Sequence, residues 1–368
     1  MSLPDTSIRV YQSTDTGAPT LSGTAGTLVS VLDCLVNGYN TVTLTSLGVA
    51  SNVATGYVSG GHGFTMIGGI VGPVITISGA TPAGLNGNWR LAGIADSTHF
   101  TFATSGIADQ TASGSITAKL AGSTFSKVFS GTNKGVYKST SLIAGTSYLR
   151  IDDTGAQSAV VGLYETMSDV DTGTGGIHDG TWYLYKSSAA SGTARAWFLI
   201  TDGIAFHLLV ENGDGTYINS GLYYGDMISY KAGDAYAALL LAGGNTASLS
   251  NYSYHLNDTT YKAVLRSYSQ AGGYVLINLL SHIKTPSYIG VGGQVSPDPV
   301  DTAIHFWPVE VWEGGNFARG LLPGVLNPIH DGSVSLIGLV VPSVNGHSVL
   351  IKQNYLGRIG FDITGPWR

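Results

Sequence analysis

The sequence predicts a mainly β protein: a small antiparallel β-barrel or sandwich domain, a larger antiparallel β domain and one short N-terminal helix. Three observations support this fold class. Short apolar runs separated by Gly, Pro, Asn and Ser recur along most of the chain, as they do in all-β domains. Two of these runs flank Asp202-Gly203, a dipeptide typical of a two-residue type I′ hairpin turn. After about residue 125, no segment of helical length carries apolar residues at a 3.6-residue period.

The hairpin over residues 195–210 is the clearest structural signal in the chain. Residues on both sides of its turn are almost all apolar. A strand with one solvated face alternates apolar and polar residues, whereas a strand covered on both faces is apolar throughout. We therefore expect this hairpin to lie inside a stack of sheets.

Residues 1–40 are expected to form a strand and a helix that pack on the C-terminal domain. The helix is predicted over residues 25–37, where apolar residues recur at helical spacing. Either Thr24 or Thr27 can cap its start, and Asn37-Gly38 supplies the left-handed stop. The apolar stripe comprises Leu28, Val31, Leu32, Leu35 and Val36.

Residues 41–122 are predicted to form the small β domain, inserted between the helix and the large domain. Trp89 is expected to be its core aromatic residue, and contact with a surface ligand is the alternative. The predicted strands cover residues 41–47, 52–58, 74–77, 87–92, 99–102 and 115–118.

Residues 123–368 are predicted to form the large antiparallel β domain. Two breaker-rich segments, 290–300 and 319–330, are expected to be long loops that contact partners. Besides the central hairpin, strands are predicted over residues 135–138, 147–151, 159–165, 181–186, 227–230, 262–266, 274–278, 304–307 and 333–337.

Composition restricts the partners of the chain. Charged residues make up 11% of the sequence, against about 25% in typical soluble domains, and there are 52 glycines and 20 tyrosines. Such a surface is poorly protected against association, so we expect copies of the chain or neighbouring proteins to cover much of it. The 17 basic residues form no run and the net charge is −6, so nucleic acid is not an expected partner.

Cysteine content and hydropathy restrict the environment of the chain. Cys34 is the single cysteine, which excludes an internal disulfide and favours a buried, apolar role for the thiol. The N-terminus lacks the basic and apolar regions of a signal peptide, and no apolar stretch approaches the ~20 residues of a membrane-spanning helix. We expect synthesis in a cytoplasm and no membrane insertion.

Familiar site motifs are incomplete in this chain. The segment 131–139 resembles a phosphate-binding loop, but Val136 and Tyr137 occupy the places of its second Gly and its Lys, which favours a β-turn. Asp169 and Asp171 have the spacing of a calcium loop, although the closing glutamate is missing, so a polar connection is favoured over a weak cation site. The nine histidines never occur at the spacing of zinc ligands.

Carboxylates and tyrosines leave two further hypotheses open. Glu310 and Glu313 could in principle serve as a glycosidase pair, but any β-rich protein contains such pairs by chance. Tyrosines cluster in polar sequence, where they stack on sugars, anchor interfaces or pack in the core. We predict no catalytic, cofactor-binding or metal-binding residue and no cofactor. The clustered tyrosines are Tyr223, Tyr224, Tyr252, Tyr254 and Tyr261.

Several segments together resemble a family of virion structural proteins of tailed bacteriophages. The resemblance spans nearly the whole chain, and as a set the segments are moderately specific. It implies a component of a phage particle, with tail or baseplate favoured over the capsid surface, and it brings no catalytic residues. The segments are residues 21–26, 31–38, 77–89, 128–133, 148–155, 164–173, 230–236 and 319–324, with Pro328 and His330.

We therefore expect a non-enzymatic structural protein of the virion, assembled in the host cytoplasm through contacts with copies of itself and other virion proteins. A receptor- or carbohydrate-binding tail protein that contacts a host glycan is the first alternative, and a capsid decoration protein is another. A glycan depolymerase is disfavoured, because the chain lacks the repeats that many such enzymes have.

Overall fold

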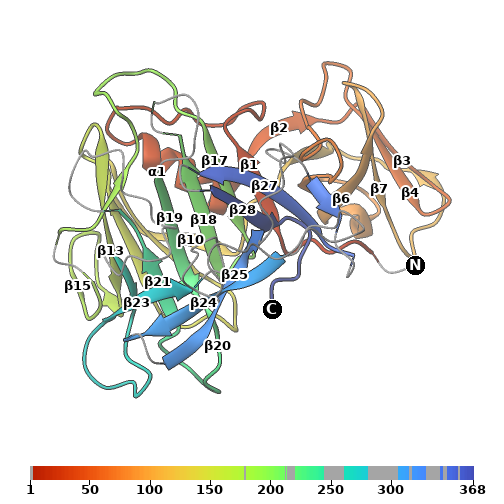
Figure 1. Ribbon diagram of the computed structural model, residues 1–368. Coiled ribbons are helices and arrows are strands. Elements are labelled where there is room, and N and C mark those ends of the chain that lie inside the picture. The colour runs from red at the N-terminus through yellow and green to blue at the C-terminus, as the bar shows by residue number, and fades with distance from the viewer. Residues whose placement is uncertain are drawn as a thin grey trace.

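A computed structural model describes residues 3–177, 180–211, 213, 220–243, 261–280, 306–314, 317–328, 340–342, 346–354 and 357–368. Its described part is a mainly β structure of antiparallel sheets with a short N-terminal helical segment, which confirms the predicted fold class (Figure 1). The two-stranded and five-stranded sheets and the eight-stranded sheet lie within residues 39–185, while the largest sheet joins the N-terminus to the C-terminal half.

The largest sheet contains the central hairpin and runs from the N-terminal strand to the C-terminal strands. Its order is β1 (Arg9–Gln12), β17 (Trp197–Thr201), β18 (Ala205–Val210), β19 (Ser220–Asp226), β21 (Ala238–Leu241), β22 (Lys262–Val264), β23 (Val275–Leu280), β24 (Phe306–Glu313), β25 (Phe317–Pro328), β28 (Gly357–Asp362), β27 (Ser348–Asn354) and β26 (Val340–Pro342), and β20 (Ile228–Ser229) pairs with β25.

The first half of this sheet is covered on both faces. On one face, Leu199 and Leu208 pack in a core with the five-stranded sheet and the N-terminal helix. On the other face, Phe198 and Leu209 pack in a second core with strands of the sheet's own second half, where the Phe198 and Phe361 rings lie 5.6 Å apart. Every residue of β17 and β18 is buried. The predicted position of the hairpin inside a sheet stack is therefore confirmed.

The turn of the central hairpin differs from the predicted type I′ turn. Gly203 has a φ of 83°, while Asp202 is not among the residues with positive φ. The Asp202 N–H donates to the Ala205 carbonyl, so the central pair of the turn is Gly203-Ile204. The cause is the Asp202 carboxylate, which accepts the backbone N–H groups of Ile204 and Ala205 at 2.9 and 2.8 Å and therefore lies before the turn.

The five-stranded sheet forms the outer layer over the central hairpin. The segment 131–139 is the predicted turn and strand, with Asn133 at a φ of 57° in the hairpin between the first two strands. The sheet order is β10 (Phe125–Gly131), β11 (Lys134–Ser139), β12 (Tyr148–Asp152), β13 (Ser158–Tyr164) and β16 (Tyr183–Tyr185), with a small ribbon of β14 (Thr166–Met167) and β15 (Gly173–Thr174) beside it.

The N-terminal helix is divided into α1 (Thr27–Leu32) and α2 (Cys34–Asn37) by Asp33. Gly38 follows α2 with a φ of 60° but a ψ of −166°, so its conformation is not the left-handed one that was expected. The predicted N-cap is wrong: Gly26 occupies the cap with no side-chain hydrogen bond. Instead, a carboxylate oxygen of Asp153 accepts the Leu28 N–H at 2.7 Å, so the first turn is capped from a distant loop.

The segment between the helix and β10 forms an eight-stranded sheet with a hydrophobic core of its own. Trp89 lies at the edge of this core, stacks on Phe102 at 5.0 Å and donates its indole N–H to the Leu85 carbonyl. The strand order is β2 (Tyr39–Thr43), β9 (Thr117–Leu120), β5 (Val74–Ser78), β6 (Gly87–Ile94), β7 (His99–Ala103), β4 (Val53–Tyr57), β3 (Ser46–Ala50) and β8 (Gln110–Thr111), with a short 3₁₀ helix at Ala83–Leu85.

The predicted loop over residues 319–330 is wrong, because most of it belongs to the long strand β25. This strand pairs with β24 on both sides of a register shift that contains Pro323 and Gly324, and with β28 and β20 over parts of its length, so these breakers lie in a strand and not in a loop. The predicted loop 290–300 and the predicted strand 333–337 lie outside the described residues.

Candidate functional site

Two of the tyrosines singled out in the sequence lie in the core. Tyr223 and Tyr224 lie on β19 and are 0% and 1% exposed, because this strand is covered on both faces. Tyr261 is half-buried and packs edge-on against Trp182 at 5.6 Å. Tyr252 and Tyr254 lie outside the described residues. For Tyr223 and Tyr224, the ligand or interface interpretation is therefore wrong and the core interpretation is right.

The two candidate carboxylate pairs make structural contacts. The Asp169 carboxylate accepts the backbone N–H groups of Asp171 and Thr172, each at 2.8 Å, and Asp171 pairs with Lys134. No cluster of three or more His, Cys, Asp or Glu residues with the geometry of a metal site occurs among the described residues.

Cys34 is a buried free thiol, and burial raises its pKa to about 12.

Glu310 and Glu313 have separate partners. The Glu313 carboxylate accepts the Tyr268 N–H and pairs with the fully buried Arg319 at 3.1 Å. The Glu310 carboxylate accepts the Trp312 indole N–H at 2.8 Å. A glycosidase pair consists of two carboxyl groups that flank the bond to be cleaved, whereas each of these two carboxylates binds a different partner in the protein.

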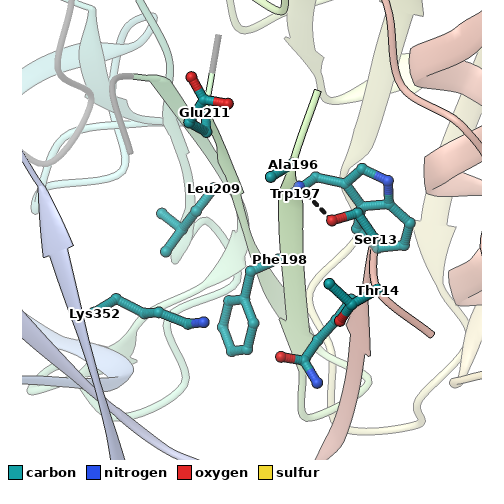
Figure 2. Close-up of a pocket in the computed structure, with 9 residues that line it drawn as sticks. Ser13, Thr14, Ala196, Trp197, Phe198, Leu209, Glu211 and Lys352 are labelled. Carbon is teal, nitrogen blue, oxygen red and sulfur yellow. Dashed lines mark hydrogen bonds between the residues drawn. The ribbon is translucent and has the colours of Figure 1, made fainter. Parts of the chain in front are cut away.

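A cavity of about 160 Å³ lies where the ends of β1, β17 and β18 meet strand β27 (Figure 2). Phe198 on β17 has one partner on each neighbouring strand. Gln12, the last residue of β1, lies opposite it on one side, and Leu209 of β18 lies opposite it on the other. Lys352 reaches the cavity from β27. Leu350, two residues earlier on β27, belongs to the same core as Phe198, as the two-residue period of a strand requires.

The Lys352 ammonium is the dominant charge at one end of this cavity. Its Nζ atom lies 4.8 Å from the centre of the Phe198 ring, a cation–π contact. Burial lowers the pKa of Lys352. No residue in the described part of the chain forms an ion pair with Lys352 or accepts a hydrogen bond from it.

Polar groups line the rest of the cavity. The Ser13 hydroxyl accepts the Trp197 backbone N–H at 3.2 Å and is thereby held in place. Gln12 and Thr14 also line the cavity. Glu211 lies at the opposite end from Lys352, with Leu209 between them in Figure 2, and its carboxylate accepts the Gly213 N–H at 2.8 Å.

A second, wider cavity of about 740 Å³ lies beside the loop 140–147. Its lining is acidic, but the carboxylates that line it already have partners within the protein. Glu165 forms a bidentate ion pair with Arg266, and Asp234 pairs with Arg319 at 2.8 Å. Asp226 accepts the Gly145 N–H at 2.6 Å, and burial raises its pKa. The cavity at Lys352 is therefore the better candidate for a binding site.

The comparisons with known proteins assign no family. No protein-family model matches the chain, and no curated protein matches it. Among the described residues, no helix has the length and apolar character to cross a membrane.

Proposed function

We propose that the chain is a non-enzymatic building block of a tailed-phage virion, associated with the tail or baseplate and assembled through contacts with copies of itself and with other virion proteins. The proposal starts from the sequence resemblance to virion structural proteins and from the low charge content of the chain. It places the protein in the virion, after assembly in the host cytoplasm.

The observation that carries the proposal is a set of four exposed large apolar side chains on β23, on β25 and in the segments that follow β20 and β22. Tyr230, Tyr268, Leu276 and Phe317 are 53%, 44%, 45% and 62% exposed. We name these four residues the aromatic patch. The strands that carry it gather at one end of the molecule (Figure 1).

Strand pairing and backbone hydrogen bonds connect three of these residues to the segments that carry the ion pairs of Arg319. Phe317 lies opposite Glu313 in the β24–β25 ladder. The Tyr268 N–H donates to Glu313, and the Tyr230 N–H donates to the carbonyl of Arg319 at 2.9 Å.

Exposed apolar surface that contains aromatic residues is typical of protein interfaces. The ion pairs of Arg319 with Glu313 and Asp234 hold the supporting strands rigidly below it. A rigid patch loses little side-chain entropy when a partner covers it, which favours an assembly role over a role as a free monomer.

Sedimentation of the purified protein tests this proposal. We expect an oligomer that Phe317→Asp dissociates, because the new carboxylate would be buried without a partner at the interface. Ile70→Asp is the matched control, since Ile70 is also 60% exposed but lies in the eight-stranded unit. A monomer at all concentrations, together with isolated copies of the protein on particles imaged by electron microscopy, would refute the proposal.

A further inference from the structure

Lys186 and Asp153 form the most deeply buried lysine–carboxylate pair in the described part of the chain. Both side chains are 0% exposed, and the Lys186 ammonium contacts Oδ1 of Asp153. The other lysine–carboxylate pairs that the described residues form with one another involve Lys127 and Lys134, and their side chains are 19–52% exposed. Water therefore reaches those pairs but is excluded from this one.

The five-stranded sheet holds this pair across one of its strands. Asp153 directly follows β12 and Lys186 directly follows β16, and the ends of both strands pair with the start of β13, which lies between them. Neighbouring strands are about 4.8 Å apart, so the pair spans roughly 10 Å between the two strand ends. The Lys186 backbone N–H donates to the Gln157 carbonyl at 2.8 Å, which fixes the point from which the lysine side chain starts.

Burial favours the uncharged forms of the two groups. It raises the pKa of the Asp153 carboxyl and lowers the pKa of the Lys186 amine, because for each group the loss of hydration outweighs the attraction of the opposite charge. Transfer of one proton from Nζ to Oδ1 leaves a neutral amine, which is a nucleophile, against a carboxylic acid. An amide product would also remove the cost of keeping two charges in the interior.

Main-chain hydrogen bonds at the pair are placed for an attack of the amine on the carboxyl group. Oδ2 of Asp153 accepts the Leu28 N–H at 2.7 Å, so negative charge that develops on this oxygen is stabilised, as in an oxyanion hole. Nζ of Lys186 donates to the Thr24 carbonyl at 2.7 Å, which holds the nitrogen beside the carboxyl group.

We propose that Lys186 and Asp153 condense to an isopeptide bond within the folded protein. Nζ bonds to Cγ of Asp153, and the electron pair of the C–O double bond moves to Oδ2. The double bond then re-forms as the bond from Cγ to Oδ1 breaks, and Oδ1 leaves as water with one proton from the ammonium group and a second from the attacking nitrogen. One carboxylate and one ammonium become one amide and one water, with no other reactant. The proposal does not depend on the proposed role in the virion.

The mass of the full chain, folded and then denatured, tests the proposal. We expect most of the protein to weigh one water molecule less than its sequence. Lys186→Arg keeps the positive charge, but a guanidinium stays protonated and does not attack, so this variant should have its full mass, as should Asp153→Ala. Lys127→Met is the matched control, because Lys127 pairs with Asp33 in contact with solvent, and it should still lose one water.

Peptide mapping locates the bond and distinguishes it from a cyclic imide elsewhere, which also costs one water. Trypsin should release residues 151–195 as one peptide, because it does not cleave after an acylated Lys186. Cleavage after Glu165 by a glutamyl endopeptidase then divides this peptide between the two linked residues. We expect the fragments 151–165 and 166–195 to stay joined.

The unsubstituted protein decides the question even if a variant fails to fold. Its full sequence mass after folding, or release of the two fragments as separate peptides, would overturn the proposal. The same loss of water in folded Asp153→Ala would also overturn it.

Discussion

Lys186 and Asp153 form an ion pair in which both side chains are 0% exposed. The Lys186 ammonium also donates to the Thr24 carbonyl at 2.7 Å, and the Asp153 carboxylate accepts the Leu28 N–H. The pair therefore joins the end of β12, the segment after β16 and the start of α1. These three segments are distant in sequence, so the ion pair fixes the helix against the five-stranded sheet.

Removing one partner of this pair should strongly destabilise the protein. Lys186→Met leaves the Asp153 carboxylate buried without a counter-charge, and we expect a loss of about 3–5 kcal/mol. Asp153→Asn should have a similar effect. The double variant is expected to lose much less than the sum of the two, since neither charge remains. Calorimetric unfolding measures all three, and strictly additive losses would contradict the coupling.

The C-terminal Trp367 requires a glycine at position 324. Gly324 has a φ of 71°, and a Cβ atom there would lie 2.2 Å from Cε2 of Trp367. Gly324→Ala is therefore expected to expel the indole from the core and to lower the midpoint of thermal unfolding sharply. In Gly346→Ala, the control, φ is 84° and nothing lies within 4 Å, so we expect only the backbone strain of about 1–2 kcal/mol. Similar losses in the two variants would contradict the role of Trp367.

Buried His207 should make the fold sensitive to acid. Burial lowers the pKa of His207 to about 3, and its Nε2–H donates to the Pro323 carbonyl at 2.7 Å. The unfolded chain takes up this proton near pH 6.5, so the contribution is present above pH 6.5 and is lost as the pH falls towards 3, by about 1.4 kcal/mol per pH unit.

Denaturant unfolding between pH 7 and pH 4 measures this dependence. His207→Gln, which keeps a donor but does not titrate, should show a smaller loss of stability over the same range. Equal pH slopes in the two proteins would show that His207 does not carry the effect.

Arg90 connects the eight-stranded unit to the N-terminal strand. Its guanidinium donates to the carbonyls of Asp5, Gly72 and Ile8 at 2.7, 3.0 and 3.0 Å. Arg90→Met leaves these carbonyls without their donor, and we expect faster amide hydrogen exchange in residues 5–12. Arg90→Lys should restore part of the protection through a single ammonium group. Unchanged exchange in Arg90→Met would show that the contact does not hold the strand.

The sequence predicts the sheets better than the features that depend on distant residues. The buried hairpin is predictable because apolar residues on both of its strands report two covered faces. The cap of α1 is not predictable, because Asp153 supplies it from the distant loop after β12. Strand β25 was mistaken for a loop because pairing with β24, β28 and β20 overrides its glycines and prolines.

The candidate site could not be predicted from any local pattern. Gln12, Phe198 and Lys352 come from the beginning, middle and end of the chain, and each is an ordinary strand residue by itself. Tyrosine content was a misleading signal, because composition does not distinguish Tyr223, in the core, from Tyr268, on the surface. The contact between Lys352 and the Phe198 ring arises only when β27 and β17 meet in the folded protein.

The pairing of β1 with β17 also sets an order of events during synthesis. The eight-stranded unit lies within one continuous stretch of chain, so it can fold as soon as that stretch has left the ribosome. By contrast, β1 precedes this unit but pairs with residues 198–201. Val10 and Tyr11, which are buried in the finished protein, must remain without their partners on β17 until translation has passed residue 200. A ribosome that stalls before residue 201 therefore holds a folded unit behind an exposed apolar strand, a nascent chain with a clear binding site for chaperones.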